Sequence, residues 1–233
     1  TWPIIALGWV INIFQRGTAS MARINEILME KPEIGDSEEV KSRTSATVEA
    51  PQIRGEVEFR NLNFSYNSTP VLCDINLRIP EGSSLAIVGP TGSGKTTLVS
   101  LIPRIYDAEP GSVLIDNIPI REYPIATLRH NLGFVPQETF LFSETVRENI
   151  AFGKEDATDD DVRSAAGAAS IAEDIESFPE QYKTVVGERG ITLSGGQKQR
   201  TAIARAIIRN PRILILDDAL SSVDTHTEDK ILN

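Results

Sequence analysis

The chain has 233 residues, of which 40% are hydrophobic and 24% are charged, an ordinary balance for a globular α/β protein that excludes a disordered tail. The formal net charge of -10 argues against a nucleic-acid partner, because phosphate backbones are bound by clustered Lys and Arg. A single cysteine, Cys73, excludes an internal disulfide, and we expect it to be buried as a small hydrophobic side chain.

The first segment, residues 4–14, is apolar and has no basic segment before it, so it does not resemble a signal peptide. It is too short to cross a bilayer, but Arg16 and Arg23 follow it, as is typical of the cytoplasmic side of a membrane helix. Taken alone, a shortened membrane helix and a buried core helix explain this segment equally well. Helical spacing continues over 11–28 and stops near Pro32, which predicts one long helix.

Residues 33–54 lack periodicity, which indicates an exposed linker, so we place a domain boundary near Gly55. Alternation over 57–59 and 62–66 predicts two short strands with one buried face, an antiparallel layer that opens the domain. Further strands are predicted by apolar runs, and a helix by a segment that Thr158 and Asp161 would cap. Strands alternating with helices predict a mostly parallel sheet. The three apolar runs are 84–88, 113–115 and 213–216, and the helical segment is 159–177.

A phosphate loop is the strongest pattern in the chain. The sequence Gly89-Pro90-Thr91-Gly92-Ser93-Gly94-Lys95-Thr96 fits G-x-x-x-x-G-K-[ST] between a predicted strand and a predicted helix. Glycines let backbone N–H groups point at phosphate, and the helix adds the positive end of its dipole. In such a loop Lys95 reaches the β and γ phosphates and the Thr96 hydroxyl holds Mg²⁺. The alternative is a Gly-rich turn with a chance lysine, which the matched flanks disfavour.

Two acidic residues follow the run at 213–216, where the carboxyl end of a strand in an α/β sheet binds ligands. Asp217 fits the Walker B role of binding magnesium, directly or through water, and Asp218 comes next. The alternative is an aspartate that caps a helix after a core strand, which is less expected beside a phosphate loop.

The segment Leu193-Ser194-Gly195-Gly196-Gln197 allows two interpretations. Ser194 and Gln197 have the spacing of an ordinary capping box. The two glycines count against a purely structural cap, because each costs roughly 1 kcal/mol in a helix relative to alanine. Glycines, a serine hydroxyl and a helix N-terminus together make a second anion site.

With these motifs the chain resembles the nucleotide-binding domain of the ATP-binding cassette (ABC) family, of the exporter half-transporter type. Residues 193–197 match the family signature LSGGQ letter for letter, and the resemblance covers 55–233 closely and 1–32 more loosely. It implies an α/β fold, a phosphate-loop NTPase core of ABC type with an antiparallel β subdomain and a helical signature subdomain. It also implies that 1–32 is the end of the last transmembrane helix, that 33–54 is a linker, and that 55–233 is a nucleotide-binding domain. We expect the chain to be truncated at both ends.

The resemblance assigns roles by matching position. Tyr66 resembles the aromatic residue that stacks on adenine, although its parity with Phe64 also allows a core role. Residues 89–97, including Thr97, together with Gln137 would hold ATP, and Lys95, Gln137 and Asp218 would take part in catalysis. The implied Mg²⁺ ligands are Thr96, Gln137 and Asp217, while Ser194, Gly195, Gly196 and Gln197 would contact the nucleotide of a partner. Residues 187–190 resemble the exporter loop that touches the membrane domain, and residues 221–224 resemble the D-loop.

In this family two domains pair head to tail, and each ATP lies between the phosphate loop of one and the signature of the other. The usual catalytic glutamate is Asp218 here, so we favour a heterodimer with a second half-transporter over a homodimer in which Asp218 is adequate. We expect a multi-pass protein of the cell membrane, with this domain on the cytoplasmic side and no nucleic-acid partner. The family's switch histidine would lie beyond Asn233, since His226 is too close to the D-loop and His130 has no motif around it.

Other classes of function remain as alternatives, among them a soluble ABC protein of DNA repair or translation, a phosphate-loop kinase and a regulatory nucleotide-binding subunit. The apolar start of the chain and its acidic charge disfavour the first, and the signature is unexplained in the second. Asp218 keeps the third open in part. We expect the chain by itself to bind ATP weakly and to turn it over poorly, and its residues do not name a cargo.

Overall fold

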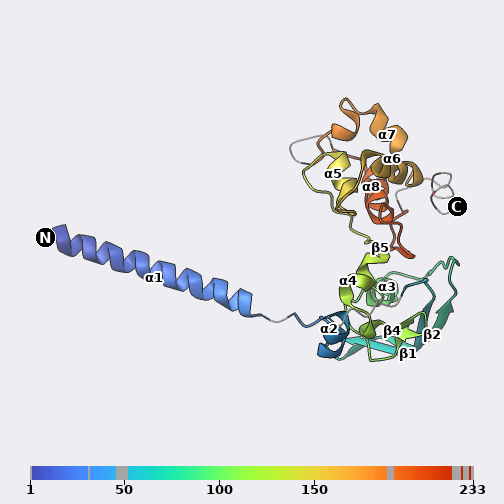
Figure 1. The fold of residues 1–233 in the computed structure, drawn as a ribbon, viewed down its shortest axis with the longest axis horizontal. Helices are drawn as coiled ribbons and strands as arrows, with labels where there is room; N and C mark the ends of the chain where they lie inside the picture. Colours follow the sequence, from blue (N-terminus) through green and yellow to red (C-terminus); the bar gives the residue numbers. More distant parts are fainter. Residues whose placement is uncertain are drawn as a thin grey trace. The chain divides into compact units, whose positions relative to one another are not determined.

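In a computed structural model of the protein, the described residues are 2–30, 32–45, 52–187, 192–221, 227 and 231. The chain divides into two compact units, residues 1–35 and 36–233. The helices are α1 (Trp2–Met29), α2 (Glu38–Ser45), α3 (Lys95–Leu101), α4 (Ile125–His130), α5 (Val146–Ala151), α6 (Asp159–Ala168), α7 (Ala172–Ser177) and α8 (Gly195–Ile207), with 3₁₀ turns η1 (Ile120–Glu122) and η2 (Gln181–Lys183). The strands are β1 (Val57–Tyr66), β2 (Thr69–Ile79), β3 (Val113–Ile115), β4 (Ile118–Pro119), β5 (Leu132–Val135) and β6 (Ile213–Leu216) (Figure 1).

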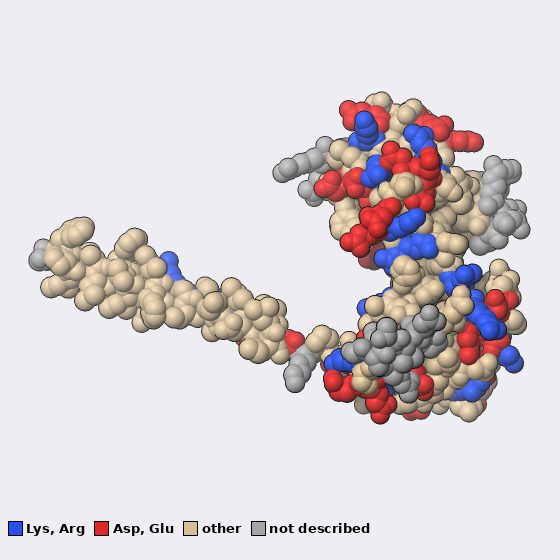
Figure 2. All heavy atoms as spheres, in the orientation of Figure 1, with Lys and Arg blue, Asp and Glu red and all other residues tan. Residues whose placement is uncertain are grey.

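The first unit is the single helix α1, which confirms the predicted long helix and starts it earlier, at Trp2. None of its residues is buried. Figure 2 shows α1 almost wholly in tan, because charged side chains on it are few. Within the parts of the chain that the structure describes, no helix combines the length and the apolarity that crossing a membrane requires.

The segment 33–54 contains regular structure where the sequence pattern predicts only an exposed linker. Helix α2 lies in it, and the side chain of Val40 is 4% exposed. The Asp36 carboxylate accepts a hydrogen bond from the N–H of Ile125 at 2.8 Å, at the start of α4. The sequence pattern does not indicate α2, because the helix is short and its polar sequence has little amphipathic periodicity. Contacts with the rest of the unit stabilise this helix instead.

The antiparallel layer is confirmed as a four-stranded sheet in the order β2-β1-β3-β4. The two short strands predicted over 57–66 are instead one strand, β1. Its register on β2 shifts between Phe59 and Leu62, where Asn61 has φ 45°. Such a bulge reverses the parity of the buried side chains, which the alternation pattern shows as a break. Cys73 is exposed rather than buried, because it alternates with buried Leu72 along β2.

The predicted parallel sheet is smaller than the sequence indicates. Strands β3 and β6 occupy the predicted positions, but the parallel pairing described is that of β5 with β6. The run at 84–88 is not a strand: no described strand pairs with its backbone, and Leu85, Ile87 and Val88 are exposed. A β-rich run becomes a strand only where a neighbour completes its hydrogen bonds, and residues 84–88 have no such neighbour among the described strands.

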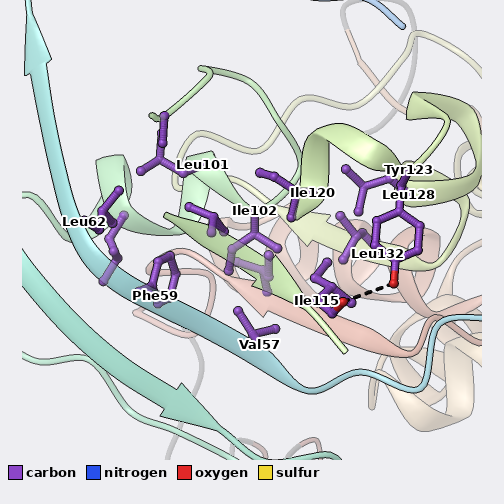
Figure 3. Packing of buried hydrophobic residues seen from close by; sticks show 14 of the residues in the cluster. Val57, Phe59, Leu62, Leu101, Ile102, Ile115, Ile120, Tyr123, Leu128 and Leu132 are labelled. Carbon is purple, nitrogen blue, oxygen red and sulfur yellow. Dashed lines mark hydrogen bonds between the residues drawn. The ribbon is translucent and has the colours of Figure 1, made fainter. Parts of the chain in front are cut away.

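Two hydrophobic clusters form the interior of the second unit. The first joins the antiparallel sheet to α3 and α4, and Figure 3 shows its side chains pointing toward one another from these elements. At its edge the buried Tyr123 hydroxyl donates to the carbonyl of Ile115 at 3.1 Å. The second cluster packs α5, α6, α7 and α8 together. Elements far apart in the sequence therefore share each cluster.

The predicted helix at 159–177 is two helices, α6 and α7, because Ser170 between them has φ 52°. The predicted cap is confirmed: Thr158 and Asp161 form a complete capping box at the start of α6. Hydrogen bonds from the Lys154 ammonium, and then from Thr158, lower the pKa of Asp161 to about 2. This carboxylate is thus held in its charged, accepting form at neutral pH.

A buried amide joins α8 to the loop before α5. Asn149 is 0% exposed, and its Oδ1 accepts from the N–H of Phe142 and from Arg205 Nη2, both at 2.8 Å. Its Nδ2 donates to the carbonyls of Phe142 and Thr145, both at 3.0 Å. Burial lowers the pKa of the Arg205 guanidinium, which also lies over the rings of Phe142 and Phe152. The side chain of Asn149 therefore satisfies several buried polar groups at once.

Replacing Asn149→Ala is expected to lower the free energy of unfolding by about 2 kcal/mol, because the N–H of Phe142 loses its acceptor and the Arg205 guanidinium keeps only its bonds to two carbonyls. Urea unfolding followed by circular dichroism measures this. As a control, Asn63→Ala removes an amide that makes two hydrogen bonds at an exposed position. Because water replaces these bonds, the change should lower the free energy of unfolding by less than about 1 kcal/mol. Equal effects of the two changes would contradict the interpretation.

Replacing Tyr123→Phe is expected to lower the unfolding free energy by about 1–2 kcal/mol near neutral pH, because the Ile115 carbonyl loses its donor. Burial raises the pKa of Tyr123 to about 12, above the ordinary value of 10.0. The neutral phenol therefore stabilises the fold fully below pH 10, and this contribution is lost as the pH rises toward 12. Urea unfolding across this window should show stability falling faster for the unchanged chain than for the Phe variant; parallel curves would refute this.

Candidate functional site

The phosphate loop has the backbone that its glycines predict. Gly92 has φ +82° and Gly94 has φ +89°, a left-handed conformation that side chains rarely adopt. A Cβ at Gly94 would also lie 2.9 Å from Leu72 Cδ2, so this side chain would have to shift, and it is the backbone conformation that favours glycine. Gly94 caps the start of α3, and Lys95 Nζ donates to the carbonyls of Gly89 at 2.8 Å and Pro90 at 3.0 Å. The ammonium is thus held against the loop, and one of its three donors remains for a phosphate.

The acidic motif lies beside this loop. The Thr96 hydroxyl, at the start of α3, donates to Asp217 Oδ1 at 3.1 Å, although 121 positions separate the two residues. Asp217 is 9% exposed and directly follows β6. Its N–H continues the parallel ladder by donating to the carbonyl of Val135 at 2.9 Å. Because parallel strands end at one edge of a sheet, the segments after β5 and β6 emerge together at this site.

Gln137 and Asp218 meet at the same edge. Gln137 follows β5, and its Nε2 donates to Asp218 Oδ2 at 3.3 Å. Asp218 has φ 53°, a left-handed conformation that aspartate tolerates better than most residues. Its carbonyl accepts hydrogen bonds from the hydroxyl of Ser221 at 3.0 Å and from Gln199 Nε2 at 3.5 Å. Gln137 therefore contacts the carboxylate of Asp218, and the turn that follows β6 fixes its backbone.

The donors at this edge fit a magnesium ion. A hydroxyl and a carboxylate are hard oxygen ligands, and Mg²⁺ is commonly held by one or two protein oxygens with waters and substrate phosphates completing its shell. Thr96 and Asp217 supply such a pair, within hydrogen-bond distance of each other. Among the residues that the structure describes, no cluster of three His, Cys, Asp or Glu is present that would hold a metal by itself. The pair of Thr96 and Asp217 therefore fits an ion whose other ligands are waters and phosphate oxygens.

The aromatic residue expected to stack on a base lies near the loop. Tyr66 is 36% exposed, and its hydroxyl lies 3.3 Å from Thr97 Oγ1 on α3. Its ring packs edge to face on Phe64 and on Tyr106, with centroids 5.0 Å and 5.1 Å apart. Packing fixes the ring of Tyr66 while part of it stays accessible, so the structure is compatible with both predicted roles, and stacking on a base stays a prediction.

The segment after Leu193 forms the capping box as well as a glycine-rich helix start. Ser194 Oγ accepts from the N–H of Gln197 at 3.2 Å, and Gln197 Oε1 accepts from the N–H of Ser194 at 3.0 Å. Gly195 and Gly196 form the first turn of α8. The box orients this turn and leaves the chemistry of an anion site in place, so the two interpretations are compatible.

Some predicted residues lie outside the described part of the chain. They are Glu188, Arg189 and Gly190 of the loop before the signature, residues 222–224 of the D-loop, and His226. His130 is the last residue of α4.

Two residues at the site are missed by the sequence analysis. Tyr106 is 42% exposed and contacts the ring of Tyr66, and Gln199 is buried and also bonds the hydroxyl of Ser221 at 3.2 Å. Neither belongs to a short motif. A polar residue among the apolar positions of α8 is the available signal for Gln199.

Comparison with known proteins supports the same family. The family model described as ABC transporter matches residues 72–221. The chain is 43% identical over 233 residues to "Probable multidrug resistance ABC transporter ATP-binding/permease protein YheI" of Bacillus subtilis (strain 168), covering 99% of this chain and 38% of that protein. It is 46% identical over 226 residues to an "ATP-dependent lipid A-core flippase" of Syntrophus aciditrophicus (strain SB), covering 97% and 36%. The chain thus spans well under half the length of these relatives.

A solved structure, "Structure of a bacterial Atm1-family ABC exporter with ATP bound", matches with a TM-score of 0.84 and 39% identity, over 97% of this chain and 38% of that chain. These likenesses confirm the family and the ABC ATPase fold that the motifs predict. The chain belongs to the ABC transporter family, as a nucleotide-binding domain similar to those of exporter ATP-binding/permease proteins.

Proposed function

We propose that this chain is the ATP-binding and ATP-hydrolysing motor of an ABC exporter. One observation carries the proposal: the hydrogen bond of Thr96 to Asp217 joins the phosphate loop to the acidic strand end in a chain of this family. Loop glycines, a lysine, a hydroxyl and a carboxylate at one sheet edge suit the binding of a nucleoside triphosphate with Mg²⁺. Lys95 would contact the β and γ phosphates, and Thr96, Asp217 and Gln137 would hold the ion.

The chain's residues would act mainly by positioning and by electrostatics, as in other phosphoryl transfers. When bound, Mg²⁺ neutralises charge on the phosphate oxygens. The N–H groups of residues 91–96 would cradle the phosphates, and Asp218 would orient the attacking water and accept its proton. The carboxylate of aspartate is withdrawn by roughly 1 Å relative to that of glutamate, and a displacement of that size can lower a rate about 100-fold.

Slow hydrolysis at this chain's own ATP site, which carries Asp218, would favour a heterodimer over a homodimer. Residues 194–197 would complete the ATP site of a partner half-transporter paired head to tail, while the partner's signature would complete the site at Lys95. ATP binding would close the pair, and hydrolysis and release would reopen it. A homodimer in which Asp218 suffices is the competing proposal, and the two differ in the turnover of the protein purified alone.

The exposed apolar surface of α1 supports a membrane location. Three of its large apolar side chains, Trp2, Trp9 and Phe14, are 68–77% exposed, which is unusual for a soluble helix. We propose that residues 1–32 end the last transmembrane helix of a multi-pass protein in the cell membrane, with the nucleotide-binding domain on the cytoplasmic side. Relatives are named for multidrug resistance and as a lipid A-core flippase, so drug and lipid are the cargo classes that we propose to test first.

The full-length protein, purified alone into lipid, provides the first test. Replacing Asp218→Glu is expected to raise its MgATP turnover by up to about 100-fold over the unchanged protein, because the carboxylate then reaches the water. Lys95→Ala defines the blank, and Asp160→Glu, which makes the same extension at an exposed position on α6, should leave the rate unchanged. The proposal of a slow site would be wrong if the unchanged protein turned over ATP well above the blank and Asp218→Glu did not raise that rate.

The role of Tyr66 is tested by ATP binding to the same protein. Replacing Tyr66→Ala is expected to weaken ATP binding by about 10-fold, since base stacking on an aromatic ring contributes about 1–3 kcal/mol. Tyr66→Phe keeps the ring and loses only the contact with Thr97, so its affinity should stay within about twofold. Calorimetry that gave the Ala and Phe variants the same affinity would assign Tyr66 to the core alone.

A further inference from the structure

A carboxylate on α7 holds the first turn of α8 from the side. Asp174 Oδ1 accepts a hydrogen bond from Gln197 Nε2 at 2.9 Å, and Asp174 Oδ2 accepts one from Arg200 Nη2 at 2.7 Å. The side chain of Arg200 is 13% exposed and that of Asp174 is 30% exposed, so water competes only partly for this pair. Both oxygens of the carboxylate therefore accept hydrogen bonds from side chains of one turn of α8.

These contacts fix the orientation of the Gln197 amide. Because its Nε2 faces Asp174, its Oε1 is turned toward the N–H of Ser194, where it accepts the bond of the capping box at 3.0 Å. The next two residues, Gly195 and Gly196, are poor helix formers, so the turn has little order of its own. The conformation of residues 194–197 thus depends on side-chain anchors, and Asp174 is the anchor outside α8.

We propose that Asp174 is a positioning residue that keeps residues 194–197 in the geometry that receives the phosphates of the partner's ATP. The inference rests on the proposed function, in which these residues complete a site across the dimer. Loss of the carboxylate frees the Gln197 amide and the helix start, so residues 194–197 are in the binding geometry in a smaller fraction of the molecules. Apparent affinity falls by that fraction, while saturating ATP restores the ordered state.

The test uses the full-length transporter in lipid, with its partner subunit where it has one. Replacing Asp174→Asn turns one of the two accepting oxygens into an N–H₂ group, which cannot accept a hydrogen bond from Gln197 or Arg200. This change should raise the KM for ATP about fivefold or more while kcat stays within about twofold. Glu173→Gln is the matched control, because it removes a charge from the neighbouring exposed position on α7, for which no contact with α8 is described. Its KM should equal that of the unchanged protein.

A second measurement reports on the loop without activity. Hydrogen exchange of the backbone amides of residues 195–198 should be faster in the Asp174→Asn protein than in the unchanged and Glu173→Gln proteins. If the Asn variant does not fold, Asp174→Glu takes its place, since the displaced carboxylate should still raise KM about twofold over the control.

Each outcome supports the inference or overturns it. A raised KM with unchanged kcat and faster exchange at 195–198 supports it. An unchanged KM with a lower kcat would show a merely structural role, since misfolded protein reduces the number of sites and not their affinity. Exchange equal to that of the control also overturns it. Absence of Lys95-dependent turnover in the unchanged transporter would instead count against the proposed function, and exchange would still decide on Asp174.

Discussion

The hydrogen bond between Thr96 and Asp217 is the constraint on which the site depends. It joins the first turn of α3 to the end of β6, two segments that meet only because β6 pairs in parallel with β5 and delivers its carboxyl end to the loop. The same pairing brings Gln137 to Asp218 at that edge. A ligand that contacts both the phosphate loop and the acidic end of β6 therefore meets groups that are already in place. Electrostatic catalysis requires such preorganisation.

Much of the site follows from the sequence because its parts are local. The conformations of Gly92 and Gly94, the cap at Thr158 and the box at Ser194 each lie within a few residues, so the chemistry of those residues determines them. The fold is less predictable where distant neighbours decide. The bulge at Asn61, helix α2 and the unpaired run at 84–88 depend on contacts that no window of the sequence contains.

The region around the signature shows why a structural and a functional interpretation of one motif need not compete. A purely structural cap does not need two glycines, and an anion site does not need a glutamine turned by an outside carboxylate. The structure contains both features, because Asp174 orients Gln197 while Gly195 and Gly196 form the first turn of α8. Asp174 belongs to no sequence motif, and its effect on Gln197 depends on the contact between α7 and α8.

The central claim is that the loop at 89–96 and the loop at 194–197 belong to two different ATP sites, each shared by two subunits. Its most direct test is an electron cryo-microscopy structure of the full-length transporter in lipid with a non-hydrolysable MgATP analogue. The account predicts that the γ phosphate lies between residues 89–96 of one subunit and residues 194–197 of the other, with the ion on Thr96 and Asp217. Analogue bound at saturation by one subunit alone, with residues 194–197 of its partner facing solvent, would contradict it.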